Sequence, residues 1–427
     1  MDLFFDLFVP QAERRLGEYL RVERERETPP LYVPQREVES RNSSLKAAGV
    51  DGGVGVVRLS NGHQVVIARA AAVGPDFMER DLVADVATID GSLHWAYLVI
   101  TESLAGLKAV GRHGVDVLFM DGSLYAKIMR LVHNLILARE FQNLYYIPEF
   151  ALALHTLSRL IEEAATRGVR LVFVSKDHNF RLVKEHLIFD RLYAKHRDAL
   201  FQRGLLWHSV LWIRRFRKEL LESYRRAQRY DYEAARLLAL LINQSITDSL
   251  LLDALLPPGR YTVPMLVGSC DAYINYKDLT TVEKLAKAAE DRLEDSLIFR
   301  LREDFNYDVA GLVRNALEKL PKIYFFYIKL RHEDKPLLAE VPAEGRMFDG
   351  APVKAFHPAA DVGDVAGFLA SHYKDPIHYN TWLWYAHTHA SFRSSQLAEY
   401  AVYLKKIIAE RGANLGVARR VKLAWGL

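Results

Sequence analysis

The sequence has little cysteine and no long apolar run, and each shortage excludes a class of protein. Its single cysteine, Cys270, among 427 residues excludes an intramolecular disulfide and any cysteine-based zinc site. No stretch approaches the roughly 20 apolar residues that span a bilayer, and the nearest candidates are strand-length runs such as residues 115–120. We therefore expect a protein without a membrane span, in a reducing cytoplasm.

An excess of one charge sign is also missing. Lys and Arg number 57 against 53 Asp and Glu, for a net charge of +4, so any nucleic-acid-binding surface must be local. The apolar N-terminal residues are interrupted by Asp2, Asp6 and Pro10, which prevents a signal-peptide core of the usual length. The 50% hydrophobic content is ample for a large buried core.

The order of the predicted elements indicates the fold class. A helix is expected over residues 11–27, and the Asn61-Gly62 turn between residues 54–59 and 63–71 predicts a hairpin. Residues 93–100 are expected to add a third antiparallel strand. Buried strands follow at 115–120 and 169–175, with helices over 124–141 and 149–167. This order is typical of a mixed α/β, ribonuclease-H-like sheet flanked by helices.

The rest of the chain is expected to complete one domain over residues 1–427. Residues 45–178 and 321–412 would form the ribonuclease-H-like core, with a strand at 323–330, a loop at 336–363 and helices near 362–371, 381–392 and 394–411. Residues 179–320 are expected to be a mainly helical elaboration that contains one strand at 261–268. No internal repeat is apparent.

Two Asp-Gly dipeptides suggest a metal site. Asp51 is expected just before a strand and Asp121 just after one, where glycine lets the backbone turn sharply. Paired carboxylates from neighbouring strands suit Mg²⁺ or Mn²⁺ in phosphoryl transfer. Asp-Gly is also a common turn dipeptide, so a turn is the alternative for each. The same four residues, Asp-Gly-Ser-Leu, recur at Asp90, which we interpret as a turn.

Two further side chains are candidates for the same site. Glu102 is expected at the end of the third strand, either as a third acidic group or as a solvated surface residue. Asn380 is expected to cap a helix whose aromatic residues form a buried face. His387 in that helix is then a hydrogen-bonded core residue, a metal ligand or a proton carrier.

Two segments outside this set suggest contact surfaces. The first is basic and suits DNA phosphates or an ordinary charged helix face, and its residues are Arg214, Arg215, Arg217, Lys218, Arg225 and Arg226. The second is apolar and suits binding to a partner or packing on this protein's own core. Its residues are Leu3, Phe4, Phe5, Leu7 and Phe8.

The ordered motifs resemble those of the NurA nucleases over nearly the whole chain. They are Asp51-Gly-Gly, Glu102, Asp121-Gly-Ser-Leu, Val174-Ser-Lys176, Asp248-Ser-Leu-Leu-Leu, Gly259-Arg-Tyr261, and the stretch from Tyr379 to His387. Two departures from the family pattern are visible. Gly53 stands where the family commonly has serine, and Asp375-Pro-Ile-His precedes Tyr379 in place of a Gly-Tyr-Pro-like approach.

The resemblance implies a function and a site. It implies a ribonuclease-H-like fold, manganese- or magnesium-dependent single-strand endonuclease and 5′ to 3′ exonuclease activity, and a homodimer that works with a hexameric HerA-type ATPase translocase in DNA double-strand-break end resection. The active-site residues would be Asp51, Glu102, Asp121, Tyr379 and His387.

The resemblance also suggests individual roles. Asp51 and Asp121 would hold the ion, while Glu102 would complete a second metal site or orient the attacking water. His387 would ligate metal or assist proton transfer. Lys176 would contact a phosphate, with a solvated lysine as the alternative.

Two other classes remain open from the sequence. A related fold that has lost catalysis could act as a DNA-binding adaptor subunit of a translocase, although all five site candidates are present here. Another ribonuclease-H-like enzyme, such as a guide-dependent nuclease or a junction resolvase, is the second alternative. Only the element with Tyr379 and His387 argues against it, and that argument depends on the resemblance.

Overall fold

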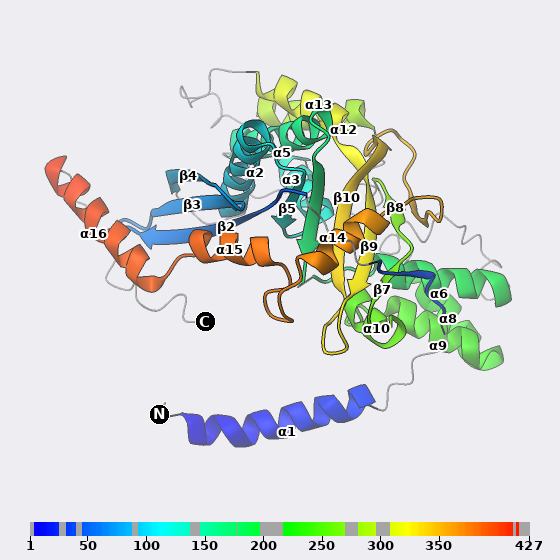
Figure 1. Cartoon of the computed structure of the whole chain (residues 1–427). Coiled ribbons are helices and arrows are strands. Elements are labelled where there is room, and N and C mark those ends of the chain that lie inside the picture. The colour runs from blue at the N-terminus through cyan, green and yellow to red at the C-terminus, as the bar shows by residue number, and fades with distance from the viewer. Residues whose placement is uncertain are drawn as a thin grey trace.

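A large mixed sheet runs through the molecule, with helices on both of its faces (Figure 1). The computed structural model describes residues 4–24, 31–39, 45–87, 93–136, 146–176, 178–196, 217–269, 281–295, 308–412 and 416–417. The predicted turn at Asp90 and the side chains of Leu3, Arg214 and Arg215 lie outside these residues. The mixed α/β class predicted from the sequence is confirmed.

Eleven strands are present in the described part of the chain, and their order is β1-β7-β9-β10-β6-β5-β2-β3-β4, with β8 between β9 and β11. Parallel pairing joins β2 to β5 and β5 to β6, and the other pairs are antiparallel. The bounds are β1 Gln35–Glu37, β2 Ala47–Arg58, β3 Gln64–Val73, β4 Met78–Ala87, β5 Val117–Asp121, β6 Arg170–Ser175, β7 Arg260–Thr262, β8 Met265–Val267, β9 Pro321–Lys329, β10 Leu337–Arg346 and β11 Lys354–Phe356.

The helices of the described residues fall into groups by what they cover. One face of the sheet packs against α2 Leu93–His113, α3 Leu124–Ile136 and α5 Ile147–Thr166, and α12 Val282–Asp295 and α13 Val309–Lys319 extend this layer. The other face packs against α14 Gly363–Ser371 and α15 Thr381–Ala390, followed by α16 Ser394–Glu410. A third group lies beyond β7 and contains α6 Leu182–Lys195, α8 Arg217–Tyr230, α9 Tyr232–Ile242 and α10 Asp248–Leu255.

The expected strand at residues 93–100 is wrong. Leu93 begins α2, whose buried residues include Leu93, Ala96, Tyr97 and Ile100, at the spacing of one helical face. The third strand of the meander is instead β4, which pairs with β3 along its whole length. Its inner and outer positions alternate along the strand, as expected of an edge strand with one half-buried face.

The expected loop at residues 336–363 is also wrong in part. Its first residues form β10, which is buried between β6 and β9. Pro342 lacks an N–H group, and the pairing with β9 becomes irregular between Pro342 and Arg346, which is where a strand tolerates proline. The predicted strand at 261–268 is two short strands, β7 and β8, separated by Val263 and Pro264.

The two segments that the sequence suggests as contact surfaces are exposed where the structure describes them. Helix α1, Phe5–Arg24, lies apart from the sheet in Figure 1, and the exposed fractions of Phe4, Phe5, Leu7 and Phe8 are between 51% and 71%. Along α8 the residues Arg217, Lys218, Arg225 and Arg226 are exposed. Within the described residues, no helix is long and apolar enough to cross a membrane.

Candidate active site where strands β2 and β5 part

Asp51 and Asp121 lie side by side because of the register of two parallel strands. The β2–β5 pairing runs from Ala47 opposite Val117 to Val50 opposite Met120, and the two aspartates are the next residues. Asp121 ends β5, whereas Asp51 lies inside β2, which continues into the hairpin with β3. The prediction that Asp51 precedes a strand is therefore wrong, although the two carboxylates come together.

The glycines of β2 let α15 lie directly on the strand. A side-chain carbon added at Gly49 would overlap the backbone of Trp382 and Leu383, and one at Gly53 would overlap the carbonyl of Ala390. Glycine is the one residue that allows such a close backbone approach. This contact explains Gly53 physically, and it brings the helix that contains His387 directly over Asp51.

The Asp51 carboxylate is hydrogen-bonded to His387. Nδ1 of His387 lies 2.6 Å from Oδ2 of Asp51, and the side chains are 65% and 6% exposed, respectively. The hydrogen bond to Asp51 raises the pKa of His387, because a nearby carboxylate favours the imidazolium form. The expected buried aromatic face of α15 is wrong, since Tyr385 and His387 are exposed and Trp382 and Trp384 are partly exposed. The predicted Asn380 cap is confirmed.

The Asp121 carboxylate accepts a hydrogen bond from the hydroxyl of Tyr379. Tyr379 is 7% exposed and has a φ of +29°, the one positive φ among the described non-glycine residues. Such backbone strain is concentrated at functional sites. The ammonium of Lys176, which directly follows β6, lies 5.5 Å from the centre of the Tyr379 ring. Burial and the charge of Asp51 raise the pKa of Asp121.

Glu102 reaches the site from the opposite face of the sheet. It lies inside α2, so the prediction that it ends a strand is wrong. Its carboxylate approaches β2 at Gly52, where an added side-chain carbon would come within 3.0 Å of Oε1 of Glu102. Burial, reinforced by the charges of Asp51 and Asp121, raises the pKa of Glu102 to about 7.

Lys127 was not predicted, and it joins Glu102 to the Asp121 turn. Its ammonium donates to Oε2 of Glu102 at 2.6 Å and to the main-chain oxygen of Asp121 at 2.7 Å. The side chains of Lys127 and Glu102 are 6% and 5% exposed. A sequence signal existed, because Lys127 is three residues after Leu124 and four before Leu131 on the buried face of α3.

Glu340 is another buried charged residue that the sequence analysis missed, after Lys127. Its Oε1 accepts a hydrogen bond from the Ser123 hydroxyl at 2.8 Å, and its Oε2 accepts one from the backbone of Tyr125 at 3.1 Å. Glu340 lies in β10 and is fully buried, which raises its pKa to about 7. It therefore fixes the turn that follows Asp121 at the N-terminus of α3.

The structure thus brings together all six residues that the sequence singled out, Asp51, Glu102, Asp121, Lys176, Tyr379 and His387. Across the described residues, no three His, Cys, Asp or Glu side chains form a ready metal cage. Asp51 and Asp121 are two carboxylates on adjacent strands, while Glu102 is paired with Lys127. Helix α8, which contains the exposed basic residues, lies on a different part of the molecule from α15 (Figure 1).

Comparison with known proteins gives similar solved structures, whereas no curated protein matches. A crystal structure of NurA is 14% identical over 95% of this chain and 97% of that chain, with a TM-score of 0.36. A NurA structure with manganese is 15% identical over 94% of this chain and 98% of that chain, with a TM-score of 0.37. A NurA structure bound to dAMP and manganese is 16% identical, covers 92% and 96% and has a TM-score of 0.35.

A match between the sequence and a protein-family model shows the family. The model of the NurA domain matches residues 45–392, a span that contains all six residues of the candidate site. Because the match covers most of the sequence, this chain belongs to the NurA family.

Proposed function

We propose that this protein is a metal-dependent nuclease that hydrolyses phosphodiester bonds of DNA at Asp51 and Asp121. The observation that supports it is the adjacency of these two carboxylates where β2 and β5 part. Lys176 and His387 lie beside them with N–H groups that can donate hydrogen bonds to an anionic substrate, while the Tyr379 hydroxyl donates to Asp121. Membership of the NurA family supports the same activity.

The side chains present fit a hard divalent cation. Magnesium-like ions are commonly bound through one or two carboxylates, with waters completing the shell. Asp51 and Asp121 would supply such a pair, and burial together with the charge of Asp51 raises the pKa of Asp121. A cation held by these carboxylates would offset the repulsion between their charges. We propose manganese, with magnesium as the alternative.

The bound ion would lower the pKa of a water and neutralise the scissile phosphate. The side chains around the two aspartates would orient the groups, bind the phosphate and move protons. The Tyr379 hydroxyl orients Asp121. The exposed imidazole of His387, paired with Asp51, can contact the phosphate or, when protonated, return a proton to the leaving oxygen. Lys176 can bind a phosphate oxygen as a point charge. Lys127 holds Glu102 against the Asp121 turn.

The finer parts of the proposal come from family membership. We propose a ribonuclease-H-like core over residues 45–178 and 321–412 with a mainly helical elaboration at 179–320. We propose single-strand endonuclease and 5′ to 3′ exonuclease activity in double-strand-break end resection. We also propose a cytoplasmic homodimer that acts with a hexameric HerA-type ATPase translocase.

The test compares three Asp→Asn variants with the wild type. Asp51→Asn and Asp121→Asn should lower cleavage of a single-stranded oligonucleotide by about 100-fold or more, because the amide keeps the shape but loses the charge. Asp90→Asn is the matched control, since its four-residue motif is identical to that at Asp121. Calorimetric titration with Mn²⁺ should show weaker metal binding by Asp51→Asn and Asp121→Asn, and unchanged binding by Asp90→Asn. Wild-type turnover by either site variant would contradict the site.

The same experiment decides between an enzyme and a DNA-binding adaptor. An adaptor would bind the oligonucleotide but leave it intact in Mn²⁺ and in Mg²⁺.

DNA contact by α8 is a separate proposal, tested by changing Arg217 and Arg225 to Ala. If they contact phosphates, the salt dependence of DNA affinity becomes less steep by about 0.7 to 0.9 per contact.

A further inference from the structure

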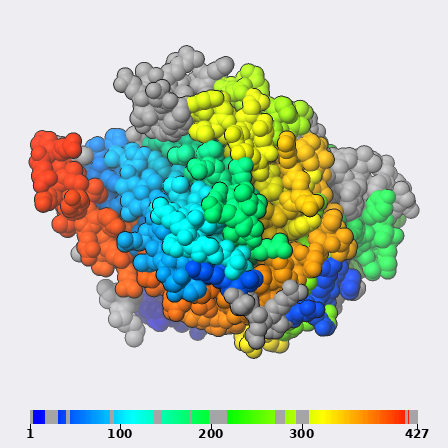
Figure 2. All heavy atoms as spheres, turned by 45° about the horizontal axis from the view of Figure 1, so that its top comes forward, coloured from blue at the N-terminus to red at the C-terminus, as the bar shows by residue number. Residues whose placement is uncertain are grey.

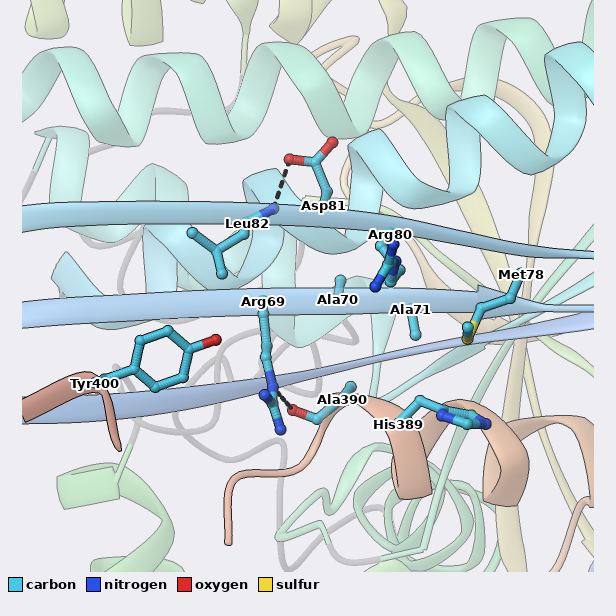
Figure 3. A pocket seen from close by; sticks show the side chains of 10 residues that line it. All are labelled: Arg69, Ala70, Ala71, Met78, Arg80, Asp81, Leu82, His389, Ala390 and Tyr400. Atoms are coloured by element: carbon cyan, nitrogen blue, oxygen red, sulfur yellow. Dashed lines mark hydrogen bonds between the residues drawn. The ribbon is translucent and has the colours of Figure 1, made fainter. Parts of the chain in front are cut away.

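A groove of about 450 Å³ lies beside the candidate active site, on the face of the sheet that α15 covers (Figure 3). Its wall and floor come from β3, β4, α15 and α16, and the lining includes Arg69, Ala71, Arg80, Leu82, His389 and Tyr400. Its volume is within the roughly 300–1,000 Å³ of small-ligand sites, which suits a nucleotide more than a duplex.

Strand register connects the groove to Asp51. Asp51 is opposite Ala71 in the β2–β3 pair, and Ala71 is opposite Arg80 in the β3–β4 pair. Directly opposite residues in antiparallel strands point to the same face, with Cα atoms about 4.5–5.5 Å apart. The Cα atoms of Arg80 and Asp51 are therefore about 10 Å apart across the three strands, with Ala71 between them. Only the methyl group of Ala71 stands between their side chains in this row of paired residues.

The groove is positively charged on this face. The Arg69 guanidinium is fixed in the wall, where it donates to the carbonyl of Ala390 at 2.8 Å and lies 4.0 Å from the Phe392 ring centre. Within the described residues, no hydrogen bond or ion pair holds the exposed guanidinium of Arg80. Asp81 also borders the groove, but its carboxylate points to the α2 side (Figure 3) and pairs with Lys108.

Two rings complete the lining. His389 is two residues after His387 on α15 and is exposed. Tyr400 extends from α16 toward Arg69 in Figure 3. A cationic groove with ring side chains is the combination that binds single strands, because each base can stack and each phosphate needs a positive partner.

We propose that this groove binds the nucleotide next to the scissile phosphodiester on a single strand that passes through the site, with Arg80 contacting its phosphate. The proposal rests on the nuclease function proposed above. An interface with a second copy of the chain is the other possible occupant of this face, since β4 is an edge strand with Met78 and Leu82 exposed. The charge of the groove favours the nucleic acid strand.

The test compares two substrates that differ in length. One is a single-stranded oligonucleotide, and the other is the p-nitrophenyl ester of thymidine 5′-monophosphate, whose only phosphate is the scissile one and which therefore offers no neighbouring phosphate to Arg80. We expect Arg80→Glu to lower kcat/KM for the oligonucleotide about 10-fold more than for the ester, because one phosphate contact becomes repulsive. Arg80→Gln should show a smaller effect of the same kind.

Arg159→Glu is the matched control, because Arg159 is an exposed arginine on α5, against the opposite face of the sheet. It should leave both substrates unaffected. The measured quantity is the ratio of kcat/KM for the oligonucleotide to kcat/KM for the ester. If this ratio is the same for Arg80→Glu as for the control, the proposal that the groove binds the strand is overturned. A changed molar mass in solution with an unchanged ratio would also overturn it and assign the face to a second copy. Failure of the wild type on both substrates would instead contradict the proposed nuclease function.

Discussion

The hydroxyl of Tyr379 donates a hydrogen bond to the carboxylate of Asp121 across 258 residues of sequence. Tyr379 has a positive φ, and the next residue, Asn380, caps α15 through its side chain. One short segment therefore sets both the orientation of Asp121 and the start of the helix that contains His387.

Changing Tyr379 to Phe should lower kcat without unfolding the protein. The ring can still pack, but Asp121 loses a hydrogen bond that lowers its pKa. Loss of a residue that orients a metal ligand typically costs about 10–100-fold in activity or metal affinity. The measurements are kcat on a single-stranded oligonucleotide, the Mn²⁺ dissociation constant and Tm. An unchanged kcat together with an unchanged metal affinity would show that Tyr379 does not orient Asp121.

Changing Lys127 to Met should destabilise the fold. Met keeps much of the side-chain volume but leaves Glu102 buried without its cation, and breaking a buried pair from one side costs about 3–5 kcal/mol. The double variant Lys127→Met with Glu102→Gln should recover part of that loss, because no buried charge is left alone. Urea unfolding of the four proteins gives the coupling. Additive effects of the two changes would contradict a direct pairing.

The sequence predicted those parts of the fold that depend on local signals. Asn61-Gly62 indicated the β2–β3 hairpin, and the unbroken apolar run before Asp121 indicated β5. It failed at residues 93–100, where a short apolar stretch fits a buried strand or a buried helix equally well. The additional turns of α2 up to His113, read together, would have decided for the helix.

The site was predicted more completely than its supports. The motifs named six residues that the structure brings together, and their roles remain proposals. Lys127 and Glu340 were missed because a charged residue on an apolar helix face or in a buried strand has meaning only once its partner is known. Those partners, Glu102 and Ser123, are 25 and 217 residues away.

The dependence of stability on pH should contain a contribution from Asp248. This carboxylate is fully buried and accepts hydrogen bonds from the backbone of Val183 and Lys184 and from the Tyr327 hydroxyl. Burial raises the pKa of Asp248 to about 6, against about 3.9 in an unfolded chain. Because the folded-state pKa is the higher one, the stabilisation is full below the unfolded value and is lost as pH rises through about 6. The loss is on the order of 3 kcal/mol.

The variant Asp248→Asn does not titrate, so its free energy of unfolding should fall less between about pH 4 and pH 6 than that of the wild type. Urea unfolding at several pH values measures both slopes. The variant is expected to be less stable at low pH, because the amide cannot accept all three hydrogen bonds. Parallel slopes for the two proteins would exclude Asp248 as the titrating group.

Deleting residues 2–8 tests the apolar N-terminus. Phe4, Phe5, Leu7 and Phe8 leave more than half of their surface exposed, and burial could stabilise each by about 1.5–3 kcal/mol. Such a cluster suits an interface with the translocase or the second protomer. We expect the deletion to weaken that association, measured by molar mass and by pull-down of a HerA-type translocase, with Tm unchanged. A large fall in Tm with association retained would place these side chains in the protein's own core.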